Sequence, residues 1–181
     1  MNIKRFRTVC RISSIVLKLF AVLSIFLVVY GFYTIYFGSE NFWFTYSGPS
    51  IPIYSMGGSM NGVMITQSEE RLAALIIVPL IVLITSYALF KGSQIFKWLG
   101  KGETPFSEKF AKTLKRLGLV LVVSDFLIPI LYYSVLSFIY EDGYQFNIGV
   151  SYTFLIGIIL YAIAGIFYYG IELQHLADET V

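Results

Sequence analysis

The residues of this sequence that could do chemistry are few and lie far apart. Glu69 and Glu70 are adjacent carboxylates of the kind that intramembrane proteases use, but such sites also need histidines within the membrane. The single histidine, His175, lies near the C-terminus, and one imidazole cannot make a metal site. The single cysteine, Cys10, has no partner for a disulfide. No phosphate-binding glycine loop is present, so the sequence predicts a protein that is not an enzyme and has no catalytic residues, metal ligands or cofactor.

The elements that carry these residues are long apolar segments. Hydrophobic residues make up 57% of the 181 residues and charged residues only 13%, which is far more apolar than a soluble domain of this size requires. Four runs approach the roughly 20 residues that span a bilayer as a helix. They cover about 12–37, 72–92, 118–140 and 148–171. The pattern predicts an all-α integral membrane protein, a four-transmembrane-helix bundle that forms one membrane domain over residues 1–181.

The distribution of positive charge predicts the orientation of this bundle. Twelve of the thirteen Lys and Arg residues precede or begin the first span or lie between the second and third spans. The other two connections carry Arg71 and five acidic residues. By the positive-inside rule, both termini face the cytoplasm of a multi-pass protein in the cell membrane. Residues 38–71 then form an outer loop, residues 91–117 a cytoplasmic loop and residues 172–181 a cytoplasmic tail.

The outer loop is long enough to have structure of its own. Segments 51–56 and 63–66 flank the glycine-rich segment 57–62, and we predict a short hairpin around this turn. Aromatic residues such as Tyr46 suit the headgroup layer of a membrane. Packing at that interface is favoured over a ligand site.

The cytoplasmic loop carries a predicted amphipathic helix. Ser107 is placed to cap a helix that starts at Glu108 and runs into the third span. Its apolar stripe consists of Phe110, Leu114 and Leu117, and its basic side consists of Lys109, Lys112, Lys115 and Arg116. Two interpretations follow. The helix lies at the inner membrane surface with its lysines among anionic headgroups, each worth about 1 kcal/mol, or the same surface docks an acidic partner.

One acidic residue lies within a predicted span. Asp125 is about seven residues into the third helix and Lys18 about six into the first, so each is roughly 10 Å from the inner boundary at about 1.5 Å per residue. We therefore predict a Lys18–Asp125 pair, because an unpaired charge at this depth is costly. In the alternative, Lys18 reaches the headgroups while Ser124 and nearby tyrosines hydrogen-bond Asp125. A proton or ion pathway would need further titratable groups, which makes transport the weaker hypothesis.

Small residues form a candidate packing face on the fourth helix. Gly149, Thr153, Gly157 and Gly165 follow one helical track that Tyr161 interrupts. Small residues let helix backbones approach closely. We expect this face to meet another helix of the same chain, and association with a second copy is the alternative.

Two segments carry a resemblance to a known family. They are Gly102-Glu-Thr-Pro-Phe-Ser-Glu-Lys-Phe and the acidic ending Gly170-Ile-Glu-Leu-Gln-His-Leu-Ala-Asp-Glu-Thr-Val. The chain resembles the bacterial membrane family called domain of unknown function 2975, which has four spans, a Pro-Phe motif in the cytoplasmic loop and a Glu-Leu-Gln tail. Thr104 lengthens the loop relative to the commoner Gly-x-Pro-Phe form. No activity is settled for that family, so no catalytic residue carries over.

The resemblance also implies a partner. Members of the family often lie beside genes for small helix-turn-helix regulators, which implies a membrane partner or sensor for such a cytoplasmic protein, with no direct nucleic-acid binding by this chain. The matching positions are Phe106, Glu172, Leu173 and Gln174, which extend the possible partner surface beyond the basic side of the amphipathic helix. The alternative function is an immunity or transport-accessory protein that acts through the outer loop.

Overall fold

The computed structural model describes residues 3–37, 44–59, 65–103, 107–140 and 143–179. In these ranges, four helices and two strands follow one another in the chain. They are α1 (Ile3–Tyr36), β1 (Ile51–Ser59), α2 (Gln67–Lys101), α3 (Glu108–Ile139), β2 (Gly143–Val150) and α4 (Tyr152–Glu179). All four helices are long and apolar enough to cross a membrane. The predicted helical fold class is confirmed to that extent, and the two strands are an addition to it.

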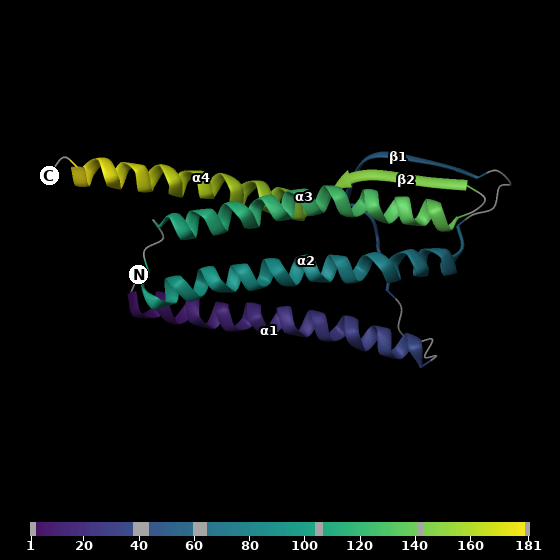
Figure 1. Ribbon diagram of the computed structural model, residues 1–181, viewed down its shortest axis with the longest axis horizontal. Helices are drawn as coiled ribbons and strands as arrows, with labels where there is room; N and C mark the ends of the chain where they lie inside the picture. Colours follow the sequence, from purple (N-terminus) through teal and green to yellow (C-terminus); the bar gives the residue numbers. More distant parts are fainter. Residues whose placement is uncertain (1–2, 38–43, 60–64, 104–106, 141–142, 180–181) are drawn as a thin grey trace.

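The helices pack in the order of the chain. In Figure 1, α1 lies beside α2, α2 beside α3, and α3 beside both α4 and β2. Both ends of the chain and the α2–α3 connection lie at one end of the molecule, which we call the termini end. The opposite end, where the strands lie, is the ribbon end. Successive helices therefore run in opposite directions.

The predicted cytoplasmic loop 91–117 is mostly helical. α2 continues to Lys101 and ends because Gly102 adopts a φ of 89°, a conformation that other residues rarely adopt. The Gly102 N–H donates to the Leu99 carbonyl at 3.0 Å. α3 begins at Glu108, and the Ser107 hydroxyl accepts from the Phe110 N–H at 3.4 Å. The predicted Ser107 cap is thus confirmed, and the connection between the helices is short.

The predicted interfacial amphipathic helix is not a separate element. Phe110, Leu114 and Leu117 are buried in the first turns of α3. Phe110 and Leu114 pack with Ile95 of α2 and Ala164 of α4. The prediction that this stripe lies in the acyl boundary is therefore wrong, because neighbouring helices extend far enough to cover it.

Serine pairs join α1 to α2. The Ser14 and Ser93 hydroxyls lie 2.9 Å apart, and Ser93 also donates to the Ser14 carbonyl at 2.8 Å. The Ser24 and Ser86 hydroxyls lie 3.1 Å apart. Hydrogen bonds between small polar side chains are one way in which helices associate in a membrane. They fix the rotation of α1 against α2.

Two glycines let α3 and α4 approach closely. A Cβ atom added at Gly118 would lie 2.6 Å from the Gly157 carbonyl oxygen, and one added at Gly157 would lie 2.9 Å from that of Gly118. The predicted packing face is thus used within the chain at Gly157. Gly165 has open space around it, and Gly149 lies in β2 rather than in a helix.

The two strands form an antiparallel ribbon, which we call the β1–β2 ribbon. Ile51 is paired with Val150 and Ser59 with Gly143. Ser137 of α3 holds β2 in place, since its hydroxyl donates to the Gln145 carbonyl at 2.8 Å and accepts from the Gln145 N–H at 3.1 Å. The ribbon thus packs against α3 through β2.

The ribbon corrects two predictions. The predicted hairpin within the outer loop is wrong, because residues 51–59 form a single strand that pairs with β2, the strand just before α4. Residues 60–64 of the predicted hairpin lie outside the described residues. The predicted helix 148–171 is also wrong at its start, since β2 runs to Val150 and α4 begins at Tyr152. β-branched residues such as Ile148 and Val150 are also frequent in strands, and pairing with β1 places them in β2 rather than in a helix.

α4 is displaced along the molecule relative to the other helices. In Figure 1 it begins beside the middle of α3, where the β1–β2 ribbon ends, and it extends past the other helices at the termini end. The ribbon and α4 together cover the length of α3. The predicted tail 172–181 is consequently helical as far as Glu179.

The close approach of α3 and α4 can be tested with one methyl group. We expect Gly118→Ala to lower the free energy of unfolding by about 1–3 kcal/mol, because the added Cβ meets backbone atoms that cannot yield. Gly165→Ala is the control, and its better helix propensity should raise stability by up to about 1 kcal/mol. Thermal unfolding in lipid nanodiscs measures both, and equal melting temperatures would contradict the packing described.

Candidate functional site

Asp125 in the middle of α3 is buried against the start of α4. Its side chain is 8% exposed, and Oδ2 accepts a hydrogen bond of 2.6 Å from the backbone N–H of Ser151. Ser151 directly precedes α4. The first N–H groups of a helix have no partner within the helix and carry partial positive charge. The carboxylate of α3 therefore caps α4 at the one point where the chain leaves the ribbon and enters that helix.

The structure does not bring Lys18 and Asp125 together. No ion pair joins these two described residues; α1, which carries Lys18, packs against α2. The predicted Lys18–Asp125 contact is thus wrong. Ser124 does not replace Lys18, because its hydroxyl donates to the Leu121 carbonyl at 3.1 Å. The sequence reasoning missed the backbone partner because it placed Ser151 inside a helix rather than at its start.

A cavity of about 180 Å³ lies beside Asp125. Its walls come from α2, α3, the segment before β1 and the start of α4. They include the oxygen-bearing residues Tyr46, Thr85, Ser124, Asp125, Ser151 and Thr153 and the aliphatic residues Ile81, Ile84, Leu121 and Ile128. The Thr85 hydroxyl donates to the Ile81 carbonyl at 2.8 Å, as Ser124 does to Leu121. Both hydroxyls therefore offer the cavity an acceptor.

Aromatic residues close the cavity on the ribbon side. Tyr46 packs on Tyr132 with ring centroids 4.5 Å apart. Burial raises the pKa of the Tyr46 phenol above its ordinary value, and the nearby Tyr133 and Asp125 act in the same direction. The conformation of the segment before β1 also depends on Gly48. Its φ is 76°, and an added Cβ would lie 2.8 Å from the Tyr133 hydroxyl.

Most of the predicted partner surface lies at the termini end. Lys109 stacks over the Trp98 ring at 4.4 Å, and Lys115 lies 5.4 Å from the ring centre of Tyr161. Lys112 forms an ion pair of 2.6 Å with Glu108. Three of the predicted cations thus contact side chains of the chain itself, and Arg116 is exposed.

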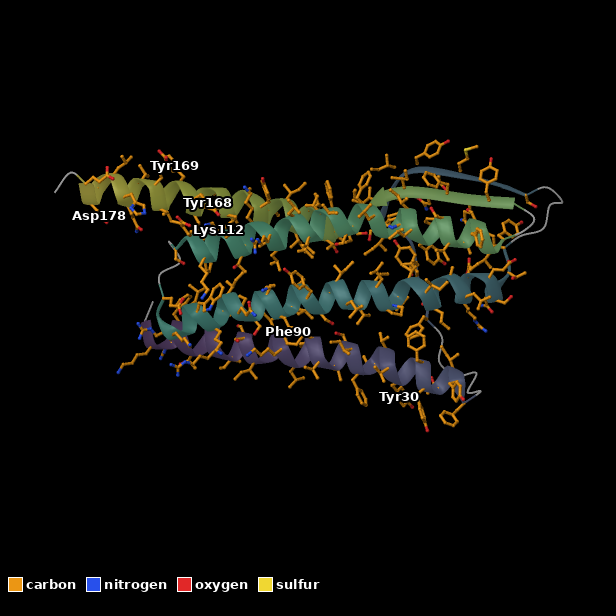
Figure 2. The ribbon with its side chains drawn as sticks, viewed as in Figure 1. Tyr30, Phe90, Lys112, Tyr168, Tyr169 and Asp178 are labelled. Carbon is orange, nitrogen blue, oxygen red and sulfur yellow. The ribbon has the colours of Figure 1, made fainter. Side chains whose placement is uncertain are left out.

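The α4 part of that surface is open. Glu172, Leu173 and Gln174 are exposed near the end of α4. Figure 2 shows Lys112 of α3 next to Tyr168 of α4, with Asp178 farther out along α4. Phe106 lies outside the described residues.

The residues considered for catalysis are far apart. Glu69 and Glu70 lie in the first turn of α2 at the ribbon end, whereas His175 lies near the end of α4 at the termini end. Cys10 is buried in α1. Among the described residues, no group of three His, Cys, Asp or Glu side chains is placed to hold a metal ion. The geometry therefore assembles no catalytic constellation from these candidates.

Comparisons with known proteins give no match. No protein-family model matches the chain, no curated protein matches its sequence, and no solved structure matches it. The resemblance to domain of unknown function 2975 thus gains no support from these comparisons and stays a hypothesis that depends on the two short motifs.

The capping role of Asp125 predicts an order of stability among variants. Asp125→Ala should lower the free energy of unfolding by about 1–3 kcal/mol, because it leaves the Ser151 N–H without its acceptor. Asp125→Asn should lower it less, since the amide oxygen of asparagine can still accept a hydrogen bond from the Ser151 N–H. Lys18→Gln should leave the melting temperature near that of the wild type, and its effect should add to that of Asp125→Asn. The ion-pair hypothesis would be restored by two results together: Lys18→Gln alone is destabilising, and the double variant is as stable as Asp125→Asn alone.

Proposed function

We propose that this chain is a non-enzymatic multi-pass protein of the cell membrane that binds a small cytoplasmic DNA-binding regulator through the end of α4. The observation that carries the proposal is the end of α4, residues 172–179, which we call the extended part of α4: all of these residues are exposed, and in Figure 1 this helix reaches past the other helices. A helix that continues past its packing partners contributes little to the bundle. It is, however, well placed to bind another protein.

The orientation in the membrane follows from the charge distribution. The basic residues near the start of α1 and those around the α2–α3 connection gather at the termini end. The positive-inside rule favours the cytoplasm for this end. Anionic headgroups there would attract the exposed Arg116 and the other cations of the same end. The extended part of α4 then faces the cytoplasm.

The extended part of α4 is amphipathic in a way that suits a DNA-binding partner. Leu173 and Leu176 are one helical turn apart and are 48% and 55% exposed. Glu172, Asp178 and Glu179 add negative charge around them. A DNA-binding regulator has a basic surface, because it must neutralise phosphates. An acidic helix with an apolar stripe can cover such a surface and so hold the regulator at the membrane, away from DNA.

The lysines of α3 have a supporting role in this proposal. Lys109 lies over the ring of Trp98, and Lys115 lies near the rings of Tyr161 and Tyr168, so these lysines help to hold α3 to α2 and α4 before α4 extends past the other helices. An interaction of this kind is worth about 0.5–1 kcal/mol at an exposed site. In this proposal, Lys109 and Lys115 fix the direction of the extended part of α4 and do not contact the partner.

A second function is favoured by one feature of the ribbon. All nine residues of β1 are exposed, and they include Ile53 at 66% and Met56 at 46%. Exposed apolar side chains on a strand are typical of a surface that binds another protein. This feature supports an immunity or transport-accessory protein that acts through its outer loop.

Crosslinking and recovery from native membranes separate the two functions. We expect a small DNA-binding protein to be recovered with the intact chain and lost when the chain is truncated after Gly170. Glu172→Lys and Leu173→Ser should each weaken recovery, because they remove charge and apolar contact. Arg116→Gln is the matched control at the same end and should recover the partner normally.

Two outcomes of the recovery experiment would contradict the proposal. If the truncated chain recovers the same proteins as the intact one, α4 does not bind the regulator. Recovery of membrane transport subunits that depends on β1, tested with Ile53→Ser, would favour the second function.

A further inference from the structure

We propose that the cavity beside Asp125 binds the head of a long-chain alkylammonium ion. The inference depends on the membrane insertion in the proposed function but not on the regulator. It concerns a site in the middle of the molecule, far from the extended part of α4.

The charge of the cavity selects a cation. Asp125 is 8% exposed, and its Oδ2 is held by the Ser151 N–H. The described residues offer no hydrogen bond to Oδ1, which leaves this oxygen for a ligand. The start of a helix carries only about half a positive charge, so the carboxylate and the helix start together remain negative. A buried site of this charge excludes anions.

Three oxygens of the cavity favour a ligand that donates hydrogen bonds. Thr85 and Ser124 use their hydroxyl protons on carbonyls of their own helices, at 2.8 and 3.1 Å. Their oxygens, like Oδ1 of Asp125, can only accept. An ammonium group has three donors and no acceptor, which matches these three oxygens.

The remaining walls select an organic cation over a metal ion. Ile81, Ile84, Leu121 and Ile128 line the cavity, as does Tyr46. Metal ions such as sodium or calcium need oxygen ligands on all sides. Methylene groups, in contrast, pack well on aliphatic walls and beside an aromatic ring, which also attracts a cation. A volume of about 180 Å³ accommodates an ammonium group and its first few methylenes.

The position of the opening favours a long apolar chain. Thr85 and Thr153 line the cavity and are themselves exposed, so the cavity opens sideways between α2 and α4. Thr85 and Asp125 lie in the apolar parts of α2 and α3, which places this opening within the apolar layer of the proposed membrane. A ligand that enters from there comes from the lipid, and its chain stays among lipid tails while its head reaches Asp125.

Binding of dodecylammonium to the protein in zwitterionic lipid nanodiscs tests the proposal, with empty nanodiscs as the reference. We expect saturable binding that is at least about tenfold tighter than that of dodecanol, because a hydrogen-bonded charge adds to the apolar contact that both share. Asp125→Asn should weaken dodecylammonium binding by about tenfold or more. Asp178→Asn is the matched control, since it removes an exposed carboxylate at the end of α4, and it should bind as the wild type does.

A second variant keeps the test valid if Asp125→Asn does not fold. Thr85→Trp narrows the opening and leaves the Asp125–Ser151 hydrogen bond in place, and it should also weaken binding by about tenfold. Equal binding of dodecanol and dodecylammonium, or unchanged binding by Thr85→Trp, would overturn the site. Because no regulator takes part, failure of this experiment is distinct from failure of the pull-down.

Discussion

The hydrogen bond between Asp125 and the Ser151 N–H is the constraint on which the arrangement of the second half of the chain depends. A helix that begins beside the middle of α3 presents unpaired N–H groups far from either end of the molecule, and such groups are costly where water is absent. The Asp125 carboxylate accepts from the first of them at 2.6 Å. This one contact accounts for both an acidic residue within an apolar helix and the late start of α4.

The late start of α4 has structural consequences at both ends. Toward the ribbon end, α3 is covered by β2, whose backbone is held by Ser137 and paired with β1. Toward the termini end, α4 extends past the other helices and exposes Leu173 and its neighbours. The site proposed for an alkylammonium ion and the surface proposed for a regulator therefore follow from the same displacement of one helix.

Much of the fold could be predicted from the sequence, but the contacts between elements could not. Apolar runs located four helices because membrane-spanning length is a property of single segments, and Ser107 marked the start of α3 because capping is local. The partner of 51–59 could not be found, since strand pairing joins segments that are distant in the chain. Asp125 was recognised as a residue that needs a partner, yet comparison of depths suggested Lys18, because a backbone N–H leaves no signal in side-chain composition.

The capping of α4 by Asp125 is tested most directly by amide hydrogen exchange at the start of that helix. In lipid nanodiscs, Asp125→Ala should speed exchange at Ser151 and the first turn of α4 by about fivefold or more, because the lost hydrogen bond is worth about 1–3 kcal/mol. Exchange in α1 should stay as in the wild type. Unchanged protection at Ser151 in the Asp125→Ala variant would contradict the account and would show that α4 begins where it does for another reason.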